Sequence, residues 1–441
     1  MSTLRWPALP SLYARLQEDK HERIGRREGI LLILAGAFVF LNAVTFSLVR
    51  EGGVTWTHLW GPVVWAISLA LAHLLLSLFG PDHDPVFLPL FALLSGWGLV
   101  LVDRLAPNFL GRQVIWVVLG TAVVVALAVL PRRLRVLRRY RYLLLLSGLL
   151  LLASTLLFGV NPSGFGAALW LPLPLPFLGG IYFQPSELLK LLLVVFLASY
   201  FAERETLLRG DRARGGLRGA LPYLAPLLLM WGFCMILLVW QRDLGAAALF
   251  FLVFLAMLYL ATGDRRYVIA GLLLLLLAAA IAYLLFDVVA LRVDAWWNPW
   301  PEAFDRAFQI VQSLYALASG GVLGQGVGQG FPTYIPVVHS DFVFAAIGEE
   351  WGLIGSLGVV AVFLLLTVRG MRAAVKTRNP FRTYLAVGIT LLFAIQALLI
   401  MGGVTKLLPL TGVTLPFISY GGSSLLVSSM MLGLLLHLSS D

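Results

Sequence analysis

The stretch His339-Ser340-Asp341-Phe342 closes a long polar segment that begins near Asp287, and a strongly apolar segment starts at Phe342. The chain of 441 residues is 60% hydrophobic and only 12% charged. An ordinary soluble domain has about 25% charged residues, so this composition predicts a polytopic membrane protein. Ionisable groups are costly where a chain enters the membrane, which makes Asp341 a candidate functional residue.

Twelve apolar stretches of the sequence are long enough, or nearly so, to cross roughly 30 Å of hydrocarbon. Each is predicted to be a helix, because a helix satisfies its own backbone hydrogen bonds in lipid. The predicted fold class is all-α polytopic, with about 12 transmembrane helices and a long loop, 287–341, between helices 9 and 10. The stretches lie near residues 30–49, 61–80, 86–102, 113–130, 141–158, 185–202, 220–239, 243–262, 267–286, 342–368, 383–402 and 414–436.

Lysine and arginine are distributed unevenly between the two sides of these spans. With the N-terminus inside, the inner segments hold 24 of the 32 basic residues and the outer segments hold 7, while Lys190 lies within a span. The positive-inside rule therefore predicts that both termini are cytoplasmic, with residues 1–29 as an N-terminal tail that lacks the features of a signal peptide. The net charge of +10 thus reflects topology and attraction to anionic membrane lipids, and nucleic-acid binding is not expected.

Other classes of site are disfavoured by residue counts. The single cysteine, Cys234, excludes a disulfide framework, and the six histidines show no spacing typical of a structural zinc site.

Two outer segments stand out: residues 159–184, which contain no lysine or arginine, and residues 287–341, the longest polar segment. The tryptophans and prolines of residues 296–301 indicate an ordered loop at the membrane interface.

The segment 183–190 has the pattern of a helix start, with Pro185 in the first turn and Glu187 close behind. Glu187 and Lys190 are three residues apart, so they share a helix face and can pair. One interpretation is helix capping with a lysine that snorkels and is neutralised by its neighbour. The other is a membrane-embedded cation near an outward-facing cavity.

The segment that follows the long loop carries three acids. Ser340 and Asp341 could cap the helix that starts there, or Asp341 could act as a general base if its pKa is raised. Glu349 and Glu350 lie two turns deeper, where adjacent carboxylates need partners or a polar cavity.

Three further segments carry weaker signals. The glycine-rich run 319–330 matches no phosphate-binding loop and is predicted to be a flexible turn, although its amides could hold an anion. In segment 408–424, Pro416 and the Gly421-Gly422 pair would break a spanning helix, as happens beside cavities, unless these small residues serve packing. Gln241-Arg242-Asp243 forms a very tight outer turn in which the last two side chains are expected to pair.

Taken together, these segments resemble the SEDS family of bacterial cell-wall proteins, the RodA and FtsW type. The resemblance covers roughly residues 84–437, which correspond to the ten spans usual in the family, and residues 30–83 form an additional N-terminal two-helix unit. The matching residues, in chain order, are Phe183-Gln184-Pro185-Ser186-Glu187 with Lys190, Asp243-Leu244-Gly245, Arg292 with Asn298-Pro299-Trp300, Gln309 with Gln312-Ser313, Gly324-Gln325-Gly326, His339-Ser340-Asp341-Phe342 with Glu349-Glu350, and Leu415-Pro416 with Ser419-Tyr420-Gly421-Gly422-Ser423.

Two single positions depart from the family pattern. Asn298 stands where many members have aspartate, so a charged role there is not expected. Ile400 stands where many members have asparagine, so that side chain cannot be generally required.

The resemblance implies a peptidoglycan glycosyltransferase that polymerises lipid II, an undecaprenyl-diphosphate disaccharide-peptide, at the outer face of the bacterial cytoplasmic membrane. It implies a class B penicillin-binding protein as transpeptidase partner, an Asp341 required for activity and a nearby Lys190. Asp341 is the expected general base of an inverting transfer, and a divalent cation, magnesium or manganese, could assist, whereas no organic cofactor is expected. Supporting roles are expected for Lys190, Glu187, His339, Ser340, Glu349 and Glu350, and contacts to the lipid diphosphate for Arg292, Gln309, Gln312, Ser419, Tyr420, Gly421, Gly422 and Ser423.

Two other functions fit part of the pattern. Broken helices and buried charges also suit a lipid II flippase, although the inner segments are short and basic rather than cavity-like. A scaffold without catalysis of its own, which supports a penicillin-binding protein, is the other alternative. The motifs do not separate the elongation and division subtypes cleanly, and the RodA type is the preferred interpretation.

Overall fold

The computed structural model describes residues 9–80, 82–129, 134–161, 167–173, 181–209 and 217–440. Residues 1–8 of the predicted tail, parts of the predicted outer segment 159–184, and residues 81, 130–133, 210–216 and 441 lie outside the described residues. The helices are α1 (Leu9–Glu51), α2 (Trp56–Phe79), α3 (Phe87–Leu105), α4 (Leu110–Val129), α5 (Arg135–Arg139), α6 (Arg141–Phe158), α7 (Pro185–Arg209), α8 (Leu217–Trp240), α9 (Leu244–Thr262), α10 (Arg265–Leu285), α11 (Asp287–Trp297), α12 (Phe308–Gly320), α13 (Val343–Glu350), α14 (Gly352–Lys376), α15 (Pro380–Val404) and α16 (Gly422–Leu438). Two short strands, β1 (Leu171–Leu173) and β2 (Ile181–Phe183), form an antiparallel pair.

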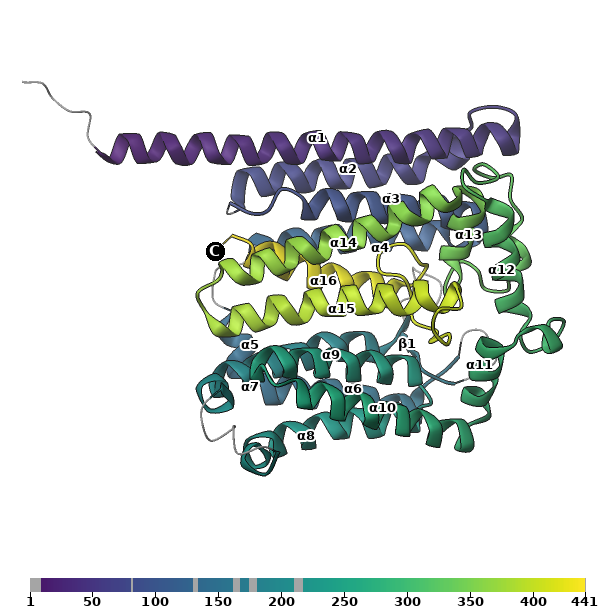
Figure 1. Cartoon of the computed structure of the whole chain (residues 1–441). Helices are drawn as coiled ribbons and strands as arrows, with labels where there is room; N and C mark the ends of the chain where they lie inside the picture. The colour runs from purple at the N-terminus through teal and green to yellow at the C-terminus, as the bar shows by residue number, and fades with distance from the viewer. Residues whose placement is uncertain are drawn as a thin grey trace, which may run out of the picture.

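The long helices lie side by side with their axes roughly parallel, and the short helices α11, α12 and α13 gather at one end of them (Figure 1). The described start of α1 and the end of α16 lie at the opposite end. Within the bundle, α16 packs on α4, α15 packs on α14 and α7, and α1 packs on α3. The core therefore lies between α3, α4, α7, α15 and α16.

The predicted all-α membrane fold is confirmed. Among the described residues, ten helices are long and apolar enough to cross a membrane, and two shorter apolar helices lie at 227–240 and in α16. Each of these twelve helices overlaps one of the twelve predicted stretches, and two of the predicted boundaries need correction. The side chains of α10 are without exception exposed or half-buried, as expected of a helix that faces lipid. The chain is a multi-pass membrane protein.

The predicted span 342–368 is wrong as a single helix, because α13 ends at Glu350 and α14 starts at Gly352. The first amides of α14 have no partners within their own helix. Those of Leu353 and Ile354 instead donate to the carbonyls of Gly321 and Val322, at 2.9 and 3.2 Å. The glycine-rich segment thus replaces one helical turn as the hydrogen-bond partner, which permits the break.

The predicted span 414–436 begins too early. α16 starts at Gly422, and residues 405–421 form an extended and turning segment, hereafter the strap, between α15 and α16. The break expected from Pro416 and the Gly421-Gly422 pair is therefore confirmed. Packing contributes as well, because a Cβ at Gly422 would overlap the Trp116 ring.

The long loop 287–341 is ordered, as its tryptophans and prolines predict. It contains α11 and α12, and the Trp296 indole donates to the Lys406 carbonyl at 3.2 Å, which fastens α11 to the strap. The prediction of a flexible turn at 319–330 is wrong, because this run packs on α13. The amides of Gln325 and Gly326 donate to the carbonyls of Glu349 and Glu350 at 2.8 and 3.1 Å, so they are not available to an anion.

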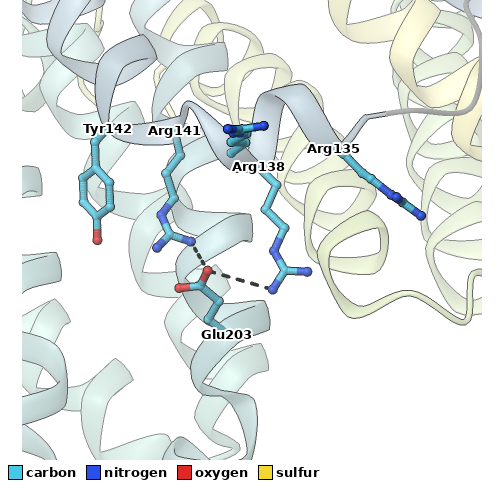
Figure 2. Close-up of a pocket in the computed structure, with 6 residues that line it drawn as sticks. Arg135, Arg138, Arg141, Tyr142 and Glu203 are labelled. Carbon is cyan, nitrogen blue, oxygen red and sulfur yellow. Dashed lines mark ion pairs between the residues drawn. The ribbon is translucent and has the colours of Figure 1, made fainter.

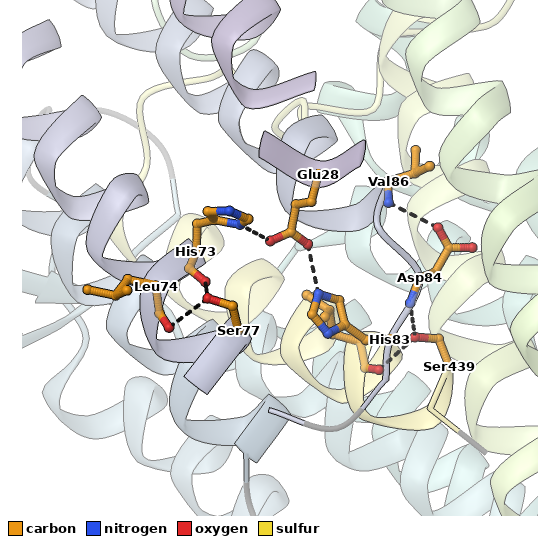
Figure 3. Close-up of polar contacts among 9 residues, drawn as sticks. Glu28, His73, Leu74, Ser77, His83, Asp84, Val86 and Ser439 are labelled. Carbon is orange, nitrogen blue, oxygen red and sulfur yellow. Dashed lines mark hydrogen bonds and ion pairs between the residues drawn. The ribbon is translucent and has the colours of Figure 1, made fainter. Parts of the chain in front are cut away.

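Buried polar contacts attach the additional unit, α1 and α2, to the rest of the bundle. Glu28 of α1 is 1% exposed and lies between His73 of α2 and His83 of the linker to α3, with both O···N distances 2.7 Å (Figure 3). The next residue, Asp84, pairs with Arg369 of α14 at 3.3 Å. At the other end of α2, His58 contacts Asp103 of α3 at 2.7 Å.

We expect Glu28→Ala to destabilise the protein, because it leaves two imidazoles without their acceptor in a buried place. Loss of such a buried, charge-assisted contact costs about 3 kcal/mol, which should lower the midpoint of thermal unfolding in detergent. Glu22→Ala, which removes an exposed carboxylate from the same helix, is the matched control and should leave the midpoint unchanged. Equal midpoints for the two variants would contradict the inferred role of Glu28.

Candidate active site

Asp341 lies in the turn before α13, half-buried, where two residues of the strap hold its neighbours. The Tyr420 amide donates to the carbonyl of His339 at 2.9 Å, and the Ser419 hydroxyl donates to the carbonyl of Ser340 at 2.6 Å. The Ser340 hydroxyl in turn donates to Asp341 Oδ1 at 2.7 Å. Two motifs that are about 80 residues apart in the sequence are thus fixed against each other.

Aromatic rings support this turn from one side. Tyr420 stacks on Phe109 with ring centroids 4.6 Å apart, and His339 lies against both rings at 5.7 and 5.4 Å. Burial lowers the pKa of His339, so its imidazole is neutral at pH 7. His339 therefore supplies shape and a ring contact, and no positive charge, beside the acid.

The strap brings Arg292 of α11 next to Asp341. The Arg292 guanidinium donates to the Thr411 carbonyl at 3.3 Å. A Cβ at the next residue, Gly412, would lie 3.4 Å from Arg292 Nη2 and 3.7 Å from Asp341 Oδ2, so both charged groups lie close to this glycine. Gly412 has φ +73°, a conformation that favours glycine.

Burial raises the pKa of the Asp341 carboxyl, while the Ser340 hydroxyl bond and the positive charge of Arg292 act in the opposite direction. The net direction is upward. A carboxylate whose pKa moves toward neutrality accepts a proton more readily than an ordinary surface aspartate, which suits a general base.

A cavity of about 40 Å³ lies on the other side of the strap and can hold ordered water. Its polar lining comes from the start of α7, from the turn before α9, from α15 and from the strap itself. The residues that line it are Gln184, Ser186, Glu187, Lys190, Asp243, Ala246, Leu249, Phe250, Gln396, Gly412, Val413 and Thr414. Gly412 also lies close to Asp341 and Arg292. The strap therefore borders the cavity on one side and Asp341 on the other.

Lys190 is the buried cation of this cavity. It is 2% exposed, its Nζ lies 2.5 Å from Glu187 Oε2, and it donates to Gln396 Oε1 at 3.0 Å. The predicted Glu187–Lys190 pair is confirmed, whereas the snorkelling interpretation is wrong because the ammonium does not reach the surface. Gln396 also donates to the Thr414 carbonyl at 2.7 Å, which connects Lys190 to the strap.

Asp243 belongs to this cavity, although the sequence interpretation placed it elsewhere. The expected pairing with Arg242 is wrong, because Asp243 accepts from the Ala246 amide at 3.2 Å and from the Ser186 hydroxyl at 3.0 Å. It caps α9 and faces Glu187 and Lys190 of α7. The available signal was an acid at the very start of an apolar span, and it was outweighed by the adjacent arginine. Gln396, in the middle of the span α15, gave no such signal.

Glu349 and Glu350 are buried but do not line the cavity. Arg104 of α3 bonds Glu350 Oε1 at 3.0 Å and also donates to the Gly330 carbonyl at 2.8 Å. Glu349 Oε1 accepts from the Phe331 amide at 2.8 Å. The two acids therefore attach the glycine-rich segment to α3 and α13. This segment precedes the turn that carries Asp341 in the sequence.

The other predicted contact residues are divided between two places. Ser423 accepts from the Gln184 amide at 3.0 Å, so the start of α16 holds the start of α7. Gly421 and Gly422 link the strap to α16. Gln309 and Gln312 lie half-buried on α12, and Gln309 donates to the Pro336 carbonyl at 3.4 Å, outside the cavity.

Within the described residues, no three or more His, Cys, Asp or Glu side chains are arranged to hold a metal ion. The cavity does contain the carboxylates of Glu187 and Asp243. Magnesium is commonly bound by one or two carboxylates together with substrate phosphates, so the donor set fits an ion that is shared with a diphosphate.

Comparison with known proteins places the chain in a family. The family model described as "Cell cycle protein" (FtsW, RodA, SpoVE) matches residues 86–441. The peptidoglycan glycosyltransferase RodA of Mycobacterium tuberculosis is 36% identical over 425 residues, which cover 93% of this chain and 90% of that protein. The probable peptidoglycan glycosyltransferase FtsW of Geobacter sulfurreducens is 40% identical over 375 residues, which cover 81% of this chain and 95% of that protein.

Two solved structures share the fold. A chain from a peptidoglycan synthase complex that coordinates polymerization and crosslinking aligns with TM-score 0.65 and 29% identity, and covers 80% of this chain and 97% of that chain. The crystal structure of the Thermus thermophilus rod shape determining protein RodA aligns with TM-score 0.57 and 27% identity, over 80% and 95% of the two chains. The predicted SEDS membership is confirmed, and this chain belongs to the FtsW, RodA and SpoVE family of cell cycle proteins.

Proposed function

We propose that this chain is a peptidoglycan glycosyltransferase that polymerises lipid II by an inverting transfer, with Asp341 as the general base. Relatives named as peptidoglycan glycosyltransferases, at 36–40% identity over most of the chain, support the activity. The observation that carries the residue assignment is the position of Asp341, which lies close to Gly412 together with Arg292, while Gly412 also borders the cavity that contains Lys190.

The reaction joins a sugar hydroxyl to an α-linked sugar diphosphate and leaves a β-1,4 bond. Inversion at the sugar carbon needs one displacement, in which a single base removes the proton of the attacking hydroxyl as the bond to the diphosphate breaks. Asp341 is half-buried, and its raised pKa favours proton acceptance. General-base catalysis of this kind contributes about 10²–10⁴-fold to the rate.

Positive charge near Asp341 would stabilise the departing diphosphate, which gains negative charge in the transition state. Arg292 is the nearer cation, and it is held by the strap rather than neutralised by a direct carboxylate contact. Lys190 is paired with Glu187 and fixed by Gln396, so it supplies a rigid but partly compensated charge. We assign Arg292 the diphosphate contact and Lys190 the organisation of the cavity.

In the cavity across the strap, Asp243 and Glu187 would hold a magnesium or manganese ion. It would neutralise part of the diphosphate charge when bound. Ser186 and Lys190 already bond these carboxylates, so the residues orient the acids whether or not an ion is present.

The basic residues support an orientation with both termini in the cytoplasm, which places Asp341 on the extracytoplasmic side. The relative found in a synthase complex supports a penicillin-binding protein as transpeptidase partner. The match to the mycobacterial RodA covers 93% of the chain, which extends well in front of residue 86 into α1 and α2, whereas the FtsW match covers 81%. This difference supports the elongation type.

Asp341→Asn should reduce the polymerisation of purified lipid II by about 10²–10⁴-fold, because the amide keeps the shape but cannot accept the proton. Asp305→Asn, at an exposed acid of the same outer loop, is the matched control and should retain full activity. The assay is run without a penicillin-binding protein, so product from the unaltered chain excludes the scaffold alternative. Near-normal product from Asp341→Asn would refute the base assignment.

The pH dependence tests the electrostatic interaction between Arg292 and Asp341. The base must be ionised, so the rate rises with pH through the raised pKa of Asp341, which the Arg292 charge holds down. Arg292→Gln removes that charge and should move the acid limb of the rate profile to higher pH. Arg306→Gln, at an exposed arginine of the same loop, should leave the limb in place. A lower rate with an unmoved limb in Arg292→Gln would show that the two groups are not coupled.

A further inference from the structure

A second pocket, of about 320 Å³, lies at the opposite end of the bundle from Asp341. It is lined by Arg135, Arg138, Arg139, Arg141, Tyr142 and Glu203, which come from α5, the start of α6 and α7 (Figure 2). Glu203 lies 17 residues along α7 from Ser186 of the active-site cavity. At 1.5 Å per residue this places the two sites about 25 Å apart along the same helix.

The pocket carries more positive charge than its own acid can neutralise. Arg141 is fixed, with its guanidinium 2.5 Å from Glu203 Oε1 and 2.9 Å from the Ser199 hydroxyl. Arg138 reaches the same carboxylate oxygen only at 3.9 Å, and both arginines point toward Glu203 in Figure 2. In the part of the chain that the structure describes, no carboxylate pairs with Arg135 or Arg139. The residues that line the pocket thus include four arginines and one carboxylate, and two of the arginines point toward that carboxylate.

The apolar surface next to the pocket belongs to α6. Leu143, Leu146 and Leu150 are 62%, 48% and 63% exposed and recur every three or four residues, so they form one stripe along the helix. The stripe begins two residues after Arg141. Acyl chains that lie on this stripe would end within about one helical turn of the arginine pocket.

We propose that this pocket binds the head group of an anionic membrane phospholipid whose acyl chains lie along the leucine stripe of α6. Arginine binds phosphate oxygens in a bidentate manner, and basic pockets between transmembrane helices bind phosphate-bearing lipid head groups. Three uncompensated charges exceed what one phosphodiester supplies, so a lipid with two phosphates binds more tightly than a lipid with one. In the proposed orientation this lipid belongs to the cytoplasmic leaflet.

The test measures lipid retention by the full chain in detergent, with native mass spectrometry during titration with cardiolipin or phosphatidylglycerol. Each arginine near a phosphate contributes about fivefold in affinity, so Arg138→Gln with Arg139→Gln should weaken cardiolipin binding about 25-fold. The matched control is Arg265→Gln with Arg266→Gln, which removes the same charge from the exposed first turn of α10, at the same end of the bundle. We expect the control to change binding by less than about threefold.

Three results would overturn the proposal. They are equal weakening by the two double variants, equal affinity for cardiolipin and phosphatidylglycerol, and complete displacement of cardiolipin by an equal concentration of inorganic diphosphate. The last would assign the pocket to a soluble anion. If the double variant does not fold, Arg135→Gln alone should weaken cardiolipin binding about fivefold, and unchanged binding contradicts the proposal equally.

Discussion

A segment that leaves helical geometry inside a membrane protein must find new partners for its backbone polar groups, and the strap, residues 405–421, meets this constraint within the protein. Two of its carbonyls accept hydrogen bonds from the side chains of Arg292 and Gln396, and its Ser419 hydroxyl donates to the Ser340 carbonyl. These bonds attach the strap to α11, to α15 and to the turn before α13. The same bonds that make the non-helical backbone tolerable therefore set the geometry of the site.

The break between α13 and α14 follows the same rule, with a different set of partners. The glycine-rich segment supplies carbonyls to the first amides of α14, and it can approach because Gly324, at φ +86°, has no Cβ to meet the Glu350 carbonyl. Arg104 then neutralises Glu350 and holds the Gly330 carbonyl. These buried polar groups would each cost free energy if they were unpaired, but together they satisfy one another's hydrogen bonds and hold the outer end of the bundle rigid.

Charged side chains are paired to different extents at the two ends of the bundle. Around the strap, the charged side chains are buried or half-buried and hydrogen-bonded, as Lys190 is with Glu187 and Gln396, and such groups have fixed positions that suit a transition state. At the opposite end, no carboxylate among the described residues pairs with Arg135 or Arg139. Charges of that kind attract mobile phosphate groups at the membrane surface rather than organise a reaction.

Composition, span length and arginine distribution were enough to predict the membrane class and the twelve apolar helices, because the cost of unpaired backbone in lipid acts on every residue alike. The Glu187–Lys190 pair was also predictable, since helical spacing is local. Only the tertiary structure placed Asp243 and Gln396 beside Lys190, and only it assigned Glu349 and Glu350 to Arg104 and the loop. Those partners come from helices far apart in sequence. Hydrogen bonds between such helices produce no repeating pattern in the sequence from which they could be predicted.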